Sequence, residues 1–148
     1  MKSAYRVLAY LVALEVVVQA AAIAYAVFGE SKFIDGGGTV DKALVESESA
    51  TFDGVAGYAV HGLNGTMIVP VIALALLVVS FFAKVPKGVQ WAGIVLALVV
   101  VQVLLGMFGH DVPFLGLLHG IGALALFVVA VIAARQVTAD ARHRAHVA

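Results

Sequence analysis

Four uninterrupted apolar runs, each long enough to cross a lipid bilayer, constrain this chain more than any other feature. A helix needs roughly 20 residues to span the hydrocarbon core, and the runs cover about residues 5–28, 57–83, 89–109 and 114–135. Lipid tolerates only helices and closed barrels, since the backbone must satisfy its own polar groups, and the alternation that a barrel requires is absent. We therefore expect one all-α, four-span domain over residues 1–148.

Composition excludes the other broad classes of protein. Of 148 residues, 63% are hydrophobic and 12% are charged, whereas a soluble domain has about 45–50% and about 25%. This excludes a soluble globular enzyme, and the abundance of apolar residues excludes disorder. A net charge of +0 gives no indication of nucleic-acid binding. With no cysteine, the chain has no disulfide, no thiolate metal site and no C-x-x-C-H attachment for c-type haem.

Charged residues indicate how the runs are oriented. The first run is too long for a signal peptide and has no cleavage site after it. If the helices run up and down, one side of the membrane carries the basic residues Lys2, Arg6, Lys84, Lys87, Arg135, Arg142 and Arg144. The loop from Gly29 to Ala56 has six acidic residues against two lysines. The positive-inside rule thus predicts a multi-pass protein of the cell membrane with both termini cytoplasmic. We interpret the acidic outer loop as a connector, with a lid as the alternative.

Three short sequences occur twice in the same order and indicate an internal repeat. Each copy has Val-Val-Val-Gln, then Phe-Gly, then His-Gly, at residues 16–19, 28–29 and 61–62 and again at 99–102, 108–109 and 119–120. The sequence therefore predicts an antiparallel up-down four-helix bundle built as a repeat of two helical hairpins. In such a bundle His61 and His119 lie at similar depth, because each is close to the outer end of its helix.

Two histidines at equal depth predict a site for a haem. Polar side chains inside a membrane usually face the interior of the bundle, and two imidazoles can fill both axial positions of a haem iron. We expect small residues one turn away to leave a flat slot for the porphyrin: Gly57 and Gly65 around His61, and Gly116, Gly122 and Ala123 around His119. Gly120, directly after His119, is expected to belong to the same site. A dinuclear metal site would instead need adjacent carboxylates, which are absent.

Structural roles remain as alternatives for these residues. His61 and His119 can act as helix glue by hydrogen-bonding Asn64, Gln19 or Gln102, and a small-xxx-small pattern commonly packs helices. Glu15 lies in the middle of the first run, where it can serve a proton relay, a quinone contact or a polar clamp with the glutamines. His110 can replace one ligand, although a surface cap explains it better. Pro70 predicts a kink below His61.

With these residues the chain resembles one half of haem A synthase, whose four-helix halves carry histidines on their second and fourth helices. It also resembles small uncharacterised four-helix bacterial membrane proteins. The resemblance implies a b-type haem held by His61 and His119. It does not imply haem A synthesis, because residues 54–58 lack the family's glutamate and the outer loop lacks its cysteine pair. A second haem site would require a second chain.

The function expected from the sequence is electron transfer through haem b, rather than stand-alone enzyme activity. Histidine at both axial positions favours electron transfer over oxygen chemistry. The expected partners are the lipid bilayer, a quinone or redox protein, and a second copy or a larger membrane complex. The alternative is an accessory helical subunit without a cofactor. A transporter is disfavoured because no span is broken by clustered glycine and proline.

Overall fold

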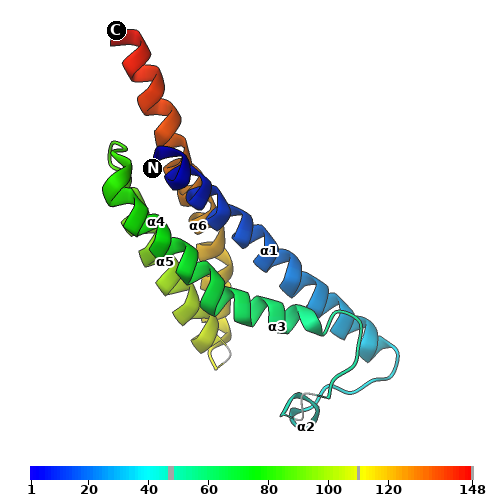
Figure 1. Cartoon of the computed structure of the whole chain (residues 1–148). Helices are drawn as coiled ribbons and strands as arrows, with labels where there is room; N and C mark the ends of the chain where they lie inside the picture. Colours follow the sequence, from blue (N-terminus) through cyan, green and yellow to red (C-terminus); the bar gives the residue numbers. More distant parts are fainter. Residues whose placement is uncertain (47–48, 110, 148) are drawn as a thin grey trace. The chain divides into compact units, whose positions relative to one another are not determined.

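The computed structural model describes the backbone of residues 1–46, 49–109 and 111–147, and the side chains of residues 1–44, 49–109 and 111–137. Figure 1 shows that its elements are helical: α1 (Lys2–Asp35), α2 (Lys42–Glu46), α3 (Ala56–Leu63), the π-helical turn η1 (Asn64–Ile68), α4 (Val69–Ala83), α5 (Gly88–Gly109) and α6 (Pro113–Val147). The described residues contain no strand.

Four helical segments have the length and composition to cross a membrane, which confirms the predicted all-α class with four candidate spans. They are Lys2–Asp35, Ala56–Ala83, Gly88–Gly109 and Pro113–Val137. The second is formed by α3, η1 and α4 in succession. Large apolar side chains along these helices are exposed, among them Phe81, Phe82 and Leu124. Such exposed apolar surface is what a bilayer would cover.

The first helix is longer than its apolar run. We expected the loop to begin at Gly29, but α1 continues to Asp35. Residues 30–35 contain no helix breaker, and the helix ends where three consecutive glycines follow. Gly37 adopts a φ of +90°, and the amide of Gly38 donates to the carbonyl of Phe33 at 3.0 Å. A residue with positive φ that redirects the chain in this way is a common helix C-terminus.

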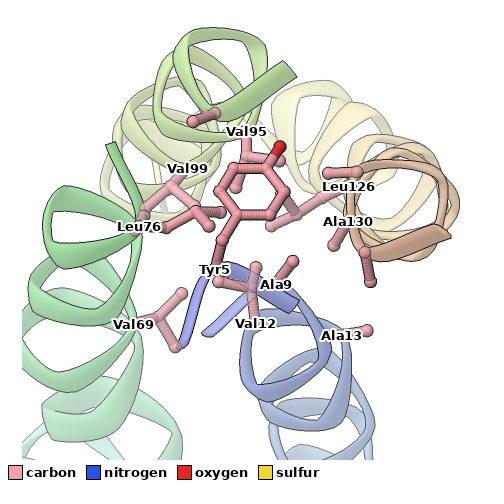
Figure 2. Close-up of a cluster of buried hydrophobic side chains, with 14 of the residues drawn as sticks. Tyr5, Ala9, Val12, Ala13, Val69, Leu76, Val95, Val99, Leu126 and Ala130 are labelled. Atoms are coloured by element: carbon pink, nitrogen blue, oxygen red, sulfur yellow. The ribbon is translucent and has the colours of Figure 1, made fainter. Parts of the chain in front are cut away.

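The chain divides into two compact units. Unit 1 comprises Met1–Val16 and the chain from Thr66 onward, and unit 2 comprises Val17–Gly65. The apolar core belongs to unit 1, where Tyr5, Val12, Leu76, Val95 and Val99 are the largest fully buried side chains. Figure 2 shows the Tyr5 ring among side chains of α4, α5 and α6. Alanines fill most of the remainder of this core and allow the helices to approach closely.

Helix α5 packs against both α4 and α6 in unit 1. A Cβ at Gly109 would contact Gly116 at 3.1 Å, and one at Gly106 would contact His119 at 3.3 Å. Moving back along α5 therefore corresponds to moving forward along α6, so these two helices run in opposite directions. Helix α4 ends at Ala83 and is followed by a tight turn. In this turn Lys84 has a φ of 51° and Lys87 a φ of 57°.

In unit 2, the second half of α1 packs against α3. A Cβ at Gly57 would overlap the carbonyl oxygen of Ala22 and contact the Ala26 side chain at 3.1 Å. A Cβ at Gly54, which has a φ of +88°, would overlap the carbonyl of Tyr25. Glycine is therefore required at both positions, because any side chain would push the two helices apart.

The loop between α1 and α3 folds back onto the end of α1. Lys32 Nζ donates to Asp53 Oδ2 at 2.7 Å, and the rings of Phe33 and Phe52 lie 5.5 Å apart. The Tyr58 hydroxyl donates to the carboxylate of Glu30. The short helix α2 also belongs to this loop. The loop is thus tied to α1 at several points rather than being a solvated connector throughout.

We predict that Tyr5→Phe lowers the free energy of unfolding by about 0.5–1.5 kcal/mol. The buried Tyr5 hydroxyl donates to the carbonyl oxygen of Gly88 at 3.1 Å, and the variant lacks this hydrogen bond between α1 and the start of α5. Thermal unfolding in detergent, followed by circular dichroism, measures the effect. Tyr10→Phe is the control, because Tyr10 is 45% exposed and should change the stability by less than about 0.5 kcal/mol. Equal effects would contradict the prediction.

We also predict that the Asp53 carboxyl titrates below its ordinary pKa of 3.8, because Lys32 donates a hydrogen bond to its charged form and attracts it. Since the pKa is lowered in the folded protein, the ion pair stabilises the loop above the ordinary pKa and is lost as the pH falls through the folded value. Carbon-13 NMR of the carboxyl group measures the midpoint. Lys32→Gln should raise it, and Lys42→Gln should not. If Lys32→Gln left the titration midpoint of Asp53 unchanged, the ion pair would be absent in solution.

Candidate functional site

His61 is anchored to the facing helix of its own unit. It lies on α3 in unit 2, is half-buried, and its Nδ1 is 3.1 Å from the backbone carbonyl oxygen of Gln19 on α1. Gln19 is the last residue of the first Val-Val-Val-Gln sequence. The hydrogen bond therefore joins two of the sequences that the repeat brings into correspondence.

His119 makes the matching contact in unit 1. It lies on α6, is half-buried, and its Nδ1 is 3.0 Å from the backbone carbonyl oxygen of Gln102 on α5. Gln102 ends the second Val-Val-Val-Gln sequence. The two pairs are separated by 42 and 17 residues, and the long loop that only the first hairpin contains accounts for this difference. The local geometry is thus the same in both units although the connections differ.

The contact at His119 indicates which imidazole nitrogen carries the proton. A carbonyl oxygen can only accept a hydrogen bond, so Nδ1 of His119 is the donor, and in the neutral ring the lone pair then lies on Nε2. Histidines that bind metals have this arrangement, with one nitrogen donating to a carbonyl and the other directed at the metal. At His61 the side-chain amide nitrogen of Gln19 also lies 2.8 Å from Nδ1 as a donor, so the backbone carbonyl and the side-chain amide of Gln19 require opposite tautomers of this ring. Each histidine taken by itself is of a type that can bind a metal, and the same contacts also connect helices without any metal.

The glycines expected to form a slot around His61 are used in packing. Gly57 is buried against Ala22 and Ala26, as described above. A Cβ at Gly65 would meet the side chain of Gln19 at 3.2 Å. Both glycines thus have a role in the contact between α1 and the helix that carries His61, and this role explains them without a cofactor.

The small residues around His119 differ from one another. A Cβ at Gly122 would overlap the side-chain amide of Gln102. Among the described residues nothing lies within 4 Å of a Cβ placed at Gly116 or Gly120. Ala123 is half-buried. Gly116 and Gly120 are therefore the members of the predicted set that packing within unit 1 leaves unexplained.

The Gln19 side chain is satisfied by the π-helical turn. In the amide orientation that satisfies its neighbours, the nitrogen donates to the carbonyl oxygen of His61 at 2.9 Å and to Nδ1 of His61 at 2.8 Å. The amide oxygen accepts from the backbone nitrogen of Gly65 at 3.0 Å and from Asn64 Nδ2 at 3.1 Å. Gln19 thus holds the helix around His61 through its side chain as well as through its backbone.

The Gln102 side chain has no such partners. It is only 8% exposed, and within the described part of the chain neither atom of its amide makes a hydrogen bond. A buried amide without partners costs free energy. The side chains of Gln19 and Gln102 therefore differ in their hydrogen bonding, although the backbone carbonyl of each contacts a histidine Nδ1.

Pro70 explains the difference between the two glutamines. Proline has no N–H and its ring clashes with the carbonyl four residues earlier, so it disturbs a regular helix. Here the disturbance takes the form of the π-helical turn η1 directly before α4. The corresponding position after His119 is Val128, and α6 remains α-helical through this region. The sequence predicted a disturbance at Pro70, but not that Gln19 would hydrogen-bond to it.

The remaining candidates are placed as follows. Glu15 is half-buried on α1. His110 lies outside the described residues. Among the residues that the structure describes, no group of three or more histidine and acidic side chains is arranged to hold a metal ion, and a site with two histidine ligands is smaller than such a group. Sequence reasoning named Gln19 and Gln102 as histidine partners, but it missed that their backbone carbonyls accept the bond.

We predict that Gln19→Met and Gln102→Met have unequal effects on stability. Gln19→Met removes the partners of Gly65 N–H and the His61 carbonyl, and should cost about 1–3 kcal/mol. Gln102→Met removes a buried amide that has no partner among the described residues, so it should change the stability by less than about 0.5 kcal/mol or increase it. Thermal unfolding of both variants, matched in size and position, measures the difference. Equal losses of stability in the two variants would contradict the conclusion that only the Gln19 side chain has hydrogen-bond partners.

Comparison with known proteins finds a match to a family model. A model described as "Family of unknown function (DUF6220)" matches residues 49–109, which is less than half of the chain. This stretch contains His61 and Gln102 but neither Gln19 nor His119. No curated protein and no solved structure matches the chain.

Proposed function

We propose that the chain is an integral membrane protein whose four spans form an antiparallel up-down bundle, built as a repeat of two hairpins. The support is the agreement between the two units in their internal contacts. In each unit a glutamine at the end of Val-Val-Val-Gln meets a histidine followed by glycine. The distribution of basic and acidic residues supports an orientation with both termini in the cytoplasm and the residue 29–56 segment outside the cell membrane.

We further propose that this bundle binds one b-type haem, with His61 and His119 as the axial ligands. The observation that carries the proposal is the shared contact between Nδ1 and a glutamine carbonyl, at 3.1 Å for His61 and 3.0 Å for His119. Two ligands of one iron are expected to be held in the same way, and the matching contacts of His61 and His119 fit that expectation.

The residues of the chain then have distinct roles. Gln19 and Gln102 orient the imidazole rings and increase the basicity of Nε2 through their carbonyl oxygens. Gly116, Gly120 and Ala123 provide space beside His119. Gly57 and Gly65 bring α1 close to the helix of His61 and position that histidine.

A haem iron with two histidine ligands supplies a one-electron couple with no open position for oxygen. The chain therefore serves electron transfer rather than catalysis on a substrate. Both histidines lie near the outer ends of their helices, so electrons would exchange with a quinone or a redox protein on that side. One haem cannot bridge a core of roughly 30 Å, and transfer across the membrane would need a second chain or another subunit.

The alternative function is that of an accessory helical subunit without a cofactor. The same hydrogen bonds favour it in one respect, because imidazole bonds to backbone carbonyls hold helices together without metal. The two functions differ in whether the purified protein absorbs visible light as a haem protein does.

An absorption spectrum of the purified protein, oxidised and then reduced with dithionite, tests the proposal. We expect the bands of low-spin haem b after expression with sufficient haem. His61→Ala and His119→Ala should each abolish or convert this spectrum, because each removes one axial ligand. His110→Ala is the matched control and should leave it nearly unchanged.

Other outcomes decide against the proposal in different ways. A colourless protein would favour the accessory subunit. Loss of the spectrum in His110→Ala, with His61→Ala or His119→Ala unaffected, would show the ligand assignment to be wrong.

A further inference from the structure

A second feature of unit 2 lies away from the histidines, where the loop returns to the end of α1. A cavity of about 310 Å³ opens there. Its lining includes an ion pair, two aromatic rings and two glycines: Lys32, Asp53, Phe33, Phe52, Gly36 and Gly38. The volume is within the range of small-ligand pockets, which is about 300–1,000 Å³.

The aromatic side chains form a fixed apolar wall. Phe52 is buried, and its ring lies 5.5 Å from that of Phe33 with 30° between the planes. A Cβ at Gly38 would overlap the Phe33 ring, so the chain passes directly over this ring only because residue 38 is glycine. The faces of such rings attract cations.

The charged side chains of the cavity are accessible and opposite in sign. Lys32 Nζ and Asp53 Oδ2 are 2.7 Å apart, and their side chains are 75% and 71% exposed. An ion pair this exposed contributes little to stability, about 0–1 kcal/mol. A ligand can therefore separate the two groups at small cost if it offers each of them a new partner of opposite charge.

The length of α1 places this cavity at the surface of the proposed membrane. The helix has 34 residues, so at about 1.5 Å per residue it exceeds a core of about 30 Å. The apolar run ends near residue 28, and the lining residues all follow it. At this level the surrounding molecules are the headgroups of phospholipids.

We propose that this cavity binds the headgroup of a zwitterionic phospholipid, with Lys32 contacting the phosphate and Asp53, Phe33 and Phe52 contacting the ammonium group. A zwitterion leaves both members of the ion pair with a partner, whereas an anionic headgroup would leave Asp53 facing negative charge. The loop around the cavity has six acidic residues and two lysines, which also disfavours an anionic lipid. The proposal depends on the membrane arrangement but not on haem.

Titration of the full-length protein in a non-ionic detergent tests the proposal. The probe is dihexanoylphosphatidylcholine, added as monomer, and the readout is the NMR shift of the Gly36 and Gly38 amides. We expect saturable binding, at least fivefold weaker binding of dihexanoylphosphatidylglycerol, and at least fivefold weaker phosphatidylcholine binding by Asp53→Asn. Phe33→Leu keeps the ion pair but removes an aromatic wall of the cavity, so it should also weaken phosphatidylcholine binding. This variant tests the proposal even if Asp53→Asn disturbs the loop.

Asp35→Asn is the matched control, because it removes one acidic charge of the same loop outside the cavity lining. It should bind phosphatidylcholine as the unmodified protein does. Shifts that rise linearly without saturation would overturn the proposal, as would equal affinity for phosphatidylglycerol or an equal loss in Asp35→Asn. The histidine variants should bind the probe normally, which separates this result from the haem experiment.

Discussion

The contact between an imidazole Nδ1 and a glutamine carbonyl is the interaction that both units of this chain share. In the proposed membrane a polar group could not exchange a lost partner for water, so each such contact would favour one alignment of two helices. The bond at His61 aligns α3 with α1, and the bond at His119 aligns α6 with α5. Small residues at neighbouring turns then permit the close contact that the bond requires. The position of each histidine along its helix is thereby set to within one turn.

A single proline makes the two halves unequal. Pro70 is accompanied by the π-helical turn Asn64–Ile68, and this turn presents Gly65 N–H to the Gln19 side chain. The second half has Val128 at the corresponding position and a regular helix, so Gln102 has no comparable group to bond. π-turns inside helices often accompany functional sites. Here the turn begins three residues after His61 and gives the neighbourhood of this histidine hydrogen bonds to Gln19 that His119 lacks at Gln102.

Much of the fold could be predicted from the sequence, because long apolar runs have few solutions in lipid. Four helices were expected and four candidate spans are present, with boundaries shifted by a few residues. The extension of α1 to Asp35 was missed, since hydropathy marks the end of an apolar run and not the end of a helix. The pairing of each histidine with a glutamine was predicted only at the level of residue type, because backbone carbonyls leave no pattern in a sequence. The folding of the loop onto α1 was also missed: it depends on Lys32–Asp53 and Phe33–Phe52, whose members are far apart in the chain.

The turn between α4 and α5 shows a conflict between folding and membrane insertion. Lys84 and Lys87 both adopt left-handed backbone conformations, which cost a residue with a side chain roughly 1–2 kcal/mol and suit glycine far better. Under the proposed orientation these lysines are the only basic residues between the second and third spans, and they keep this turn in the cytoplasm during synthesis. Replacing them by glycine would relax the finished fold and remove the charges that direct its insertion. Lys84 and Lys87 thus keep an unfavourable left-handed backbone at a turn whose positive charge would help to orient the chain during insertion.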